Sequence, residues 1–180
     1  MASSWGLLGD IERMRGNYES AMELKIKSFN LRKELGDRPG MCMSLRTQAE
    51  IRREQKQFNE AETLIHQARE IAQSLNSADE IAQVTETLGT IERDRGNLDE
   101  AEVLLKDALS QMQQLGMTWH IAETNWDLAQ LYHAKNNPEL AQQHYTIAHQ
   151  LFTQLGALKD IEKLEGRWRT EDGRERTEEG

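Results

Sequence analysis

Histidine is the side chain with which metal chemistry would begin in this sequence. There are five: His66, His120, His133, His144 and His149. Metal-binding histidines on one helix normally stand four residues apart, with a third ligand on the same face. His144 and His149 stand five apart, which turns them away from a common line. We therefore expect no metal site.

Nucleophilic and acid–base chemistry find no better support. Cys42 is the single cysteine, which excludes an internal disulfide and a multi-cysteine zinc site. A nucleophile needs a positioned base, and no residue can be given that role from the sequence. The glycines stand singly, without a phosphate-binding loop, and the Asp and Glu residues fall at polar helix positions. We expect no catalytic residue, no cofactor and no enzyme activity.

The arginines recur at a regular spacing that could form a binding surface. Arg13, Arg53 and Arg93 stand forty residues apart, and His133 continues the series. A guanidinium presents a fork of donors that suits a carboxylate. Whether these residues share one surface depends on the elements that carry them.

A forty-residue period runs through the chain. The segment RGNYESA at 15–21 returns as RGNLDEA at 95–101. Two columns of apolar residues keep the same register, Ala21, Ala61, Ala101 and Ala141 in one and Ile11, Ile51, Ile91 and Leu131 in the other. A period of about 20–50 residues is typical of a solenoid or a propeller.

Each period contains two predicted helices. In residues 78–117, Ile81, Val84, Leu88 and Ile91 recur at the spacing of one helix face. Gly96 is placed to end that helix in a left-handed conformation, and the second helix runs to Leu115. A short turn between them makes the helices antiparallel neighbours. No alternating β-branched run occurs, so the predicted class is all-α, with small alanines where helices cross closely.

Charge and composition limit the partners. The net charge of −9 argues against nucleic-acid binding through a basic surface. No apolar run approaches the roughly 18 residues of a membrane span, and no signal peptide is recognisable. We expect a cytoplasmic protein that binds neither nucleic acid nor membrane.

The repeated residues resemble the tetratricopeptide repeat family. Trp5, Leu8, Gly9, Gly16, Tyr18, Ala21 and Ser28 follow its pattern, and Leu88, Gly89, Gly96, Leu98, Ala101 and Ala108 repeat it. The second copy departs most, with Gln48 and Lys56 in place of leucine and glycine. The repeat length of forty residues resembles that of the long-helix variety found in kinesin light chains and in bacterial regulators. The resemblance implies a right-handed α-solenoid of about four helix pairs.

The resemblance also implies a ligand site. In this family the first helix of each pair lines a concave groove that holds a peptide or a helix. The positions that would face the groove include Arg13, Arg46, Arg53, Arg93, Trp126, Gln130 and His133. An arginine ladder there would suit an acidic peptide, with Trp126 as an aromatic anchor. In the alternative interpretation the arginines pair with neighbouring carboxylates such as Glu50, Glu54 and Asp94, each pair being weak.

The predicted organisation is an array over residues 1–168 and a charged tail over 169–180. The repeats are expected at about 1–37, 38–77, 78–117 and 118–157, followed by a capping helix at 158–168 and a disordered tail. The expected function is a scaffold or adaptor that binds a protein or peptide, including an acidic segment. The alternatives are a structural or regulatory segment of a larger signalling protein, and a self-assembling array.

Overall fold

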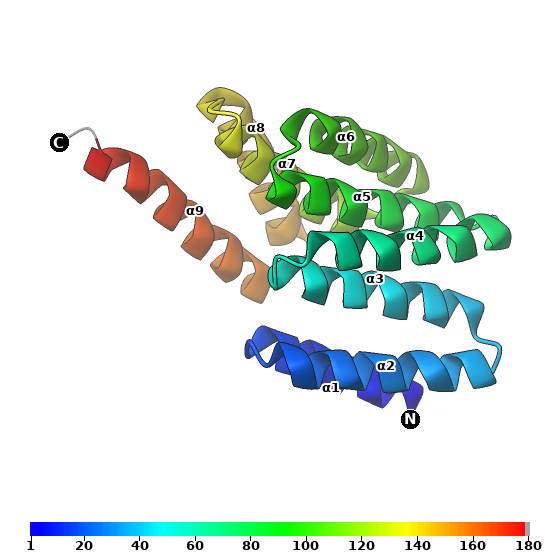
Figure 1. Ribbon diagram of the computed structural model, residues 1–180. Helices are drawn as coiled ribbons and strands as arrows, with labels where there is room; N and C mark the ends of the chain where they lie inside the picture. Colours follow the sequence, from blue (N-terminus) through cyan, green and yellow to red (C-terminus); the bar gives the residue numbers. More distant parts are fainter. Residues whose placement is uncertain (179–180) are drawn as a thin grey trace. The chain divides into compact units, whose positions relative to one another are not determined.

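The structure is a computed structural model that describes the backbone of residues 1–178 and the side chains of residues 1–168. The described residues form α-helices joined by short turns and contain no strand (Figure 1). The helices are α1 (Ala2–Met14), α2 (Tyr18–Glu34), α3 (Arg38–Glu54), α4 (Phe58–Leu75), α5 (Ala78–Arg95), α6 (Leu98–Leu115), α7 (Thr118–Ala134), α8 (Pro138–Gln154) and α9 (Leu158–Glu178). The predicted all-α class is confirmed.

The turns repeat one geometry every twenty residues. After each of α1 to α8 one residue adopts a positive φ, namely Gly16, Gly36, Lys56, Asn76, Gly96, Gly116, Asn136 and Gly156. The amide of the following residue then bonds a carbonyl five positions back, as from Asn17 to Glu12 at 2.9 Å and from Asn97 to Glu92 at 2.9 Å. This closure satisfies carbonyls left open at a helix end. The predicted left-handed end at Gly96 is confirmed, with φ at +99°.

Lys56 adopts this conformation without being glycine, with φ at 60°. It stands in the copy that departs most from the repeat pattern. A left-handed backbone costs a residue with a Cβ atom roughly 1–2 kcal/mol, so the turn geometry of the array overrides the local preference of lysine.

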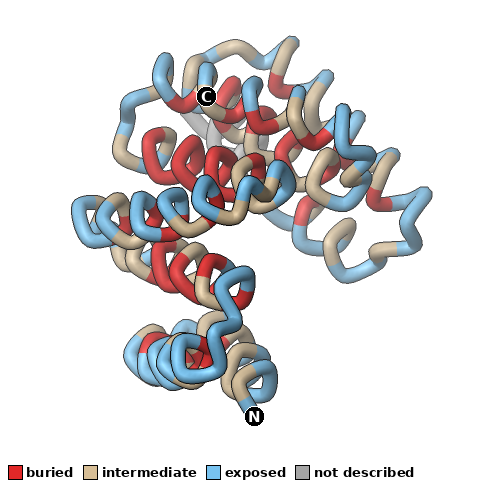
Figure 2. The backbone as a smooth tube through the Cα atoms, turned by 90° about the vertical axis from the view of Figure 1, so that its right-hand side faces the viewer, coloured by how far each residue is buried: buried red, intermediate tan, exposed pale blue. Residues whose placement is uncertain are grey.

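The helices divide into two compact units, Met1–Gln111 and the residues from Met112 onward. In the first unit each helix from α1 to α5 packs on its neighbour in sequence, and α3 also packs on α5. An apolar cluster in this unit joins α3, α4 and α5 through residues such as Ala49, Ile65 and Ile91. Figure 2 shows buried residues along the inward faces of the helices and exposed residues along the outward faces.

The second unit contains α7, α8 and α9. The α8 helix packs on α7 and on α9, and Phe152 and Leu164 lie in a cluster with Ala122 and Ala148. Trp119 meets Phe152 edge-on, with ring centroids 5.4 Å apart.

Small residues stand where helices come close. The alanines of the column Ala21, Ala61, Ala101 and Ala141 are at most 1% exposed. Gly89 shows the reason, because a Cβ atom there would lie 2.8 Å from Cγ of Leu105 on α6. Real contacts of that length essentially do not occur in close-packed interiors.

The α9 helix is longer than expected. In place of a disordered tail after residue 168, the helix continues to Glu178. The segment RTEDGRERTE is rich in Arg and Glu, which are good helix formers, and contains no proline. The expectation for residues 179 and 180 lies outside the described residues. None of the described helices has an apolar stretch long enough to cross a membrane.

Candidate functional site: the charged face of α1, α3 and α5

The structure distributes the predicted groove residues over both units. Arg13 lies on α1, Arg46 and Arg53 lie on α3, and Arg93 lies on α5, all in the first unit. Trp126, Gln130 and His133 lie on α7 in the second unit. The two sets are described separately below.

The arginines of the first unit form ion pairs that connect successive helix pairs. Nη1 of Arg13 lies 2.9 Å from Oε1 of Glu54 and 3.2 Å from Oε2 of Glu50, both on α3. Nη1 of Arg53 lies 2.5 Å from Oδ2 of Asp94 at the end of α5. Arg13–Glu54 and Arg53–Asp94 are each separated by 41 residues, so the same contact recurs one repeat later.

The other two arginines bind carboxylates of their own helices. Nη1 of Arg46 lies 3.2 Å from Oε1 of Glu50, one helical turn away. Nε of Arg93 lies 2.9 Å from Oδ1 of the adjacent Asp94. We call the resulting surface of Arg13, Arg46, Arg53, Arg93, Glu50, Glu54 and Asp94 the charged face.

Burial and charge act in opposite directions on these groups. Burial lowers the pKa of the Arg13 guanidinium, but Glu50 and Glu54 outweigh burial and leave that pKa above its ordinary value. The side chains of Arg13, Arg46 and Arg53 are between 16% and 24% exposed, so solvent reaches part of each group. Partly exposed pairs of this kind each contribute modestly to stability.

The arginines keep unused donors. Arg13, Arg46 and Arg53 bind carboxylates only through Nη1 among the described residues. Their Nε atoms are buried without an acceptor there. Arginine offers five N–H donors, so these residues retain capacity for a further acceptor.

Lys25 is a charged contact that the sequence analysis missed. Its Nζ donates to Oδ1 of Asp10 at 2.7 Å, and the lysine side chain is only 4% exposed. Burial lowers the pKa of Lys25, while the bond to Asp10 acts against that effect. The lysine stem fills the space beside Gly9, where a Cβ atom would lie 3.1 Å from Lys25 Cε. Gly9 of the repeat motif was the sequence signal that a side chain of the next helix approaches α1 closely at this position.

The predicted residues of α7 lie in an aromatic cluster. Trp126 meets Tyr145 of α8 and Trp168 of α9 edge-on, with ring centroids 6.4 and 6.3 Å apart. Trp168 stacks on Tyr145 at 4.5 Å and meets His133 at 6.4 Å. Gln130 is partly buried on the same helix. This packing favours a structural role for Trp126, and its role as a ligand anchor stays a prediction.

Metal and thiol chemistry gain no support from the geometry. The described side chains include no group of three His, Cys, Asp or Glu residues placed to hold a metal ion. Nδ1 of His144 lies 2.9 Å from Oδ1 of the buried Asn125, and His149 lies 3.1 Å from Glu165. Cys42 is fully buried, and burial, followed by the charge of Glu80, raises the pKa of its thiol to about 12.

Comparisons with known proteins give one family and one fold. A sequence model described as tetratricopeptide repeat matches residues 1–76 and 80–154. No curated protein matches the sequence.

Three solved structures illustrate the fold. BtubC (BKLC) from P. vanneervenii has a TM-score of 0.66 at 20% identity, covering 86% of this chain and 64% of its own. A Rap protein complexed with competence and sporulation factor has a TM-score of 0.74 at 15% identity, covering 94% and 53%. A putative kinesin light chain with nearly identical repeats from Podospora anserina has a TM-score of 0.63 at 14% identity, covering 96% and 95%. The chain thus spans between about half and two thirds of the length of the first two.

Proposed function

Because the chain belongs to the tetratricopeptide repeat family, we propose that it is a protein-interaction module whose charged face binds a peptide or helix of a partner protein. The observation that carries the proposal is the set of unused donors on Arg13, Arg46 and Arg53. These three side chains lie on α1 and α3, the first helices of two successive pairs. A stacked array uses such helices to present an extended surface.

The acidity of the partner follows from the chemistry of the donors. A guanidinium that already donates to one carboxylate through Nη1 can donate to a second carboxylate through Nη2. The partner's carboxylates then add to the internal ion pairs without displacing them. An acidic segment therefore fits the face better than a basic one, which would compete with the arginines for Glu50, Glu54 and Asp94.

A related observation supports a peptide as the ligand. The Rap protein of the same fold is complexed with competence and sporulation factor. We do not propose that this chain binds the same factor. Trp126, Gln130 and His133 remain proposed contacts of secondary importance, because the aromatic cluster holds Trp126 and His133.

Fluorescence anisotropy with a labelled peptide tests the proposal. The probe is an extended peptide rich in Asp and Glu, and its comparison is the same peptide with Asn and Gln instead. We expect the acidic probe to bind and the double variant Arg46→Gln, Arg53→Gln to bind it at least tenfold more weakly, since each charge-assisted hydrogen bond contributes about 1.5–3 kcal/mol.

The matched control is Arg15→Gln, Arg38→Gln, which removes the same charge outside the charged face. Arg15 pairs with Glu12, and Arg38 binds Ser74. Circular dichroism verifies that both variants keep their helices. If both variants lose the same affinity for the acidic probe, the effect comes from net charge alone and not from the charged face. If the parent protein does not bind the acidic probe, the proposal is refuted.

A further inference from the structure

The end of α3 and the start of α4 differ from the equivalent segment one repeat later. We call residues 48–60 the α3–α4 junction and residues 88–100 the α5–α6 junction. Both belong to the first compact unit, so they can be compared directly. Residues 88–92 of the α5–α6 junction are all buried, whereas the buried residues of the α3–α4 junction are Gln48, Ala49 and Ile51. The α3–α4 junction is therefore the less densely packed of the two.

Gln48 is a buried polar side chain at a position that other repeats fill with leucine. It is 5% exposed, and its forty-residue equivalents Leu88 and Leu128 are 9% and 0% exposed. Its Nε2 atom is buried without a hydrogen-bond partner among the described residues. A buried donor that gives up its bond to water without replacing it costs free energy. Opening of the α3–α4 junction returns this donor to water and removes that cost.

Lys56 is the second departure, because its backbone adopts a conformation that its side chain disfavours. Its φ is 60°, and the equivalent residues in this left-handed region are Gly16, Gly96 and Asn136. Glycine has no Cβ atom to clash there, and asparagine visits the region more readily than other residues. Opening of the turn therefore releases strain at Lys56 that the equivalent turns do not carry.

Arg52 supplies side-chain contacts that hold this turn closed. Its Nη1 donates to Oε1 of Gln57 at 2.7 Å and to Oε1 of Gln55 at 3.1 Å. Its Nε lies 3.1 Å from Oε2 of Glu60, and the two side chains are 27% and 56% exposed. Because solvent reaches both charged groups, their ion pair contributes little to stability.

The α5–α6 junction has the same contacts with donor and acceptor exchanged. Glu92 stands at the position of Arg52 and accepts from Nδ2 of Asn97 at 2.6 Å. Its Oε1 also lies 3.1 Å from Nη1 of Arg95, and the Glu92 side chain is only 5% exposed. Hydrogen bonds are stronger where water is excluded. The α5–α6 turn is therefore held more firmly than the α3–α4 turn.

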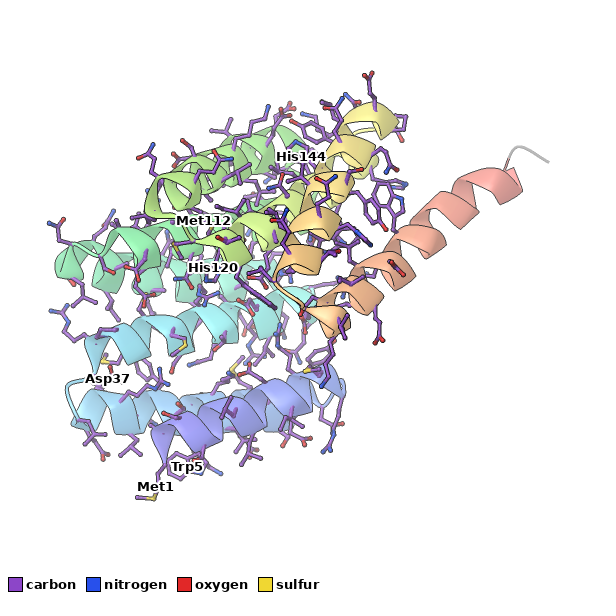
Figure 3. All side chains as sticks on the ribbon, turned by 180° about the vertical axis from the view of Figure 1, so that it is seen from behind. Met1, Trp5, Asp37, Met112, His120 and His144 are labelled. Carbon is purple, nitrogen blue, oxygen red and sulfur yellow. The ribbon has the colours of Figure 1, made fainter. Side chains whose placement is uncertain are left out.

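The other end of α3 is well anchored. Oδ1 of Asp37, which is labelled in Figure 3, accepts from the amide of Gly40 at 3.0 Å. Nη1 of Arg32 donates to the carbonyl oxygen of Gly40 at 2.6 Å, and Arg32 is 7% exposed. At the start of α4, Gln57 provides no side-chain cap within the described residues. These contacts locate the weak point where α3 meets α4 and not where α3 begins.

We propose that the α3–α4 junction opens locally while the rest of the first unit stays folded. Opening removes Arg53 and Glu54 from the charged face, because it breaks their ion pairs with Asp94 and Arg13. Exposure of Ile51, which is fully buried in the closed state, keeps the open state a minor population. The charged face is thus complete only while the junction is closed, and this inference does not depend on ligand binding there.

Amide hydrogen exchange of the full chain, followed by NMR under native conditions, tests the proposal. The matched probes are the amides of Gln57 and Asn97, which bond the carbonyls of Arg52 and Glu92 at 2.8 and 2.9 Å. After correction for intrinsic rates, we expect Gln57 to exchange at least about tenfold faster, the order of effect of one unpaired buried donor. Exchange of Gln57 as slow as that of Asn97, or slower, overturns the proposal.

Two variants restore the residues of the third repeat. Gln48→Leu and Lys56→Gly should each slow exchange of the Gln57 amide at least about threefold and leave Asn97 unchanged. The reciprocal variant Gly96→Lys should accelerate exchange at Asn97. If Gln48→Leu and Lys56→Gly leave the Gln57 amide unchanged, the junction does not open for the reasons given and the proposal is overturned.

The control is Gln67→Leu, which makes the same substitution at an exposed position of α4. It should leave exchange at Gln57 and Asn97 as in the parent protein. If Gln67→Leu slows exchange at Gln57 as much as Gln48→Leu does, the effect does not come from the buried amide, and the proposal is overturned.

Discussion

At the residue scale, Cys42 shows how the repeat register assigns a role to a reactive side chain. It stands in the column of Ala82 and Ala122, and all three residues are 0% exposed. Its Sγ lies 3.4 Å from the carbonyl oxygen of Ala68. A thiol whose pKa is about 12 is neutral near pH 7, so Cys42 acts as a small packing residue.

Titration of Cys42 should make stability depend on pH. The unfolded thiol ionises near its ordinary pKa of 9.0 and the folded thiol near 12. Between these values the folded state holds the additional proton, so the thiol's contribution to stability is complete below pH 9.0 and falls as pH rises. The loss reaches about 1.4 kcal/mol per pH unit.

Urea unfolding at pH 8 and pH 10 measures this effect against Cys42→Ala, a substitution that the neighbouring repeats already contain. The parent protein should lose about 1 kcal/mol relative to the variant over this interval. An unchanged difference between the two proteins would mean that the folded thiol ionises normally.

Gly89 supports a second prediction at this scale. A Cβ atom at this position would lie 2.8 Å from Leu105 Cγ, and Leu105 is fully buried. Gly89→Ala should therefore destabilise the protein by about 1–3 kcal/mol, as overpacking does. Gly6→Ala is the control, because its nearest neighbour is Ser28 Oγ at 3.7 Å. It should gain about 0.5–1 kcal/mol in a helix, and similar unfolding midpoints would contradict the packing argument.

At the scale of elements, the ion pairs of the charged face connect one helix pair to the next. Arg13 joins α1 to α3, and Arg53 joins α3 to α5. Both ion pairs add to the apolar packing that holds successive helix pairs together. They also fix the side chains whose remaining donors would meet a ligand.

A double-mutant cycle on Arg53→Gln and Asp94→Asn should give a coupling of about 0.5–1 kcal/mol that decreases with salt. Asp94 also binds Arg93, so Asp94→Asn alone should be the more destabilising single change. The control is Glu102 and Lys106, an exposed pair within α6, for which we expect about 0.3–0.5 kcal/mol. A coupling no larger than the control would indicate that Arg53–Asp94 does not link the helix pairs.

At the scale of the whole molecule, packing between neighbours implies local stability. Each repeat of an array contacts mainly its neighbours, so a change weakens the region where it is made. The two compact units, each with its own apolar cluster, are consistent with this behaviour.

Leu164→Ala tests the local character of stability. Leu164 is 2% exposed and packs with Phe152 and Ala148, so the substitution should cost about 2–5 kcal/mol in the second unit. Hydrogen exchange should accelerate in α8 and α9 and remain unchanged in α1 and α2. Uniform acceleration along the chain would show that the protein unfolds as one cooperative body.

Much of the fold was readable from the sequence because its signals are local. Helical spacing, left-handed residues every twenty positions and alanines every forty positions are each encoded within a few turns of chain. The second repeat illustrates the limit, since Lys56 takes a left-handed conformation that its own type does not predict. The length of α9 was also missed, because low apolar content was interpreted as disorder.

The sequence by itself therefore determined the register of the repeats, the all-α class and the buried alanine column. It did not determine which carboxylate each arginine binds. Arg13 reaches Glu54 and Arg53 reaches Asp94 because of how one helix is rotated against the next, and Trp126 meets Trp168 because α9 folds back near α7. A periodic sequence specifies which residues share a face, but a contact between faces depends on distances that arise only after the helices pack.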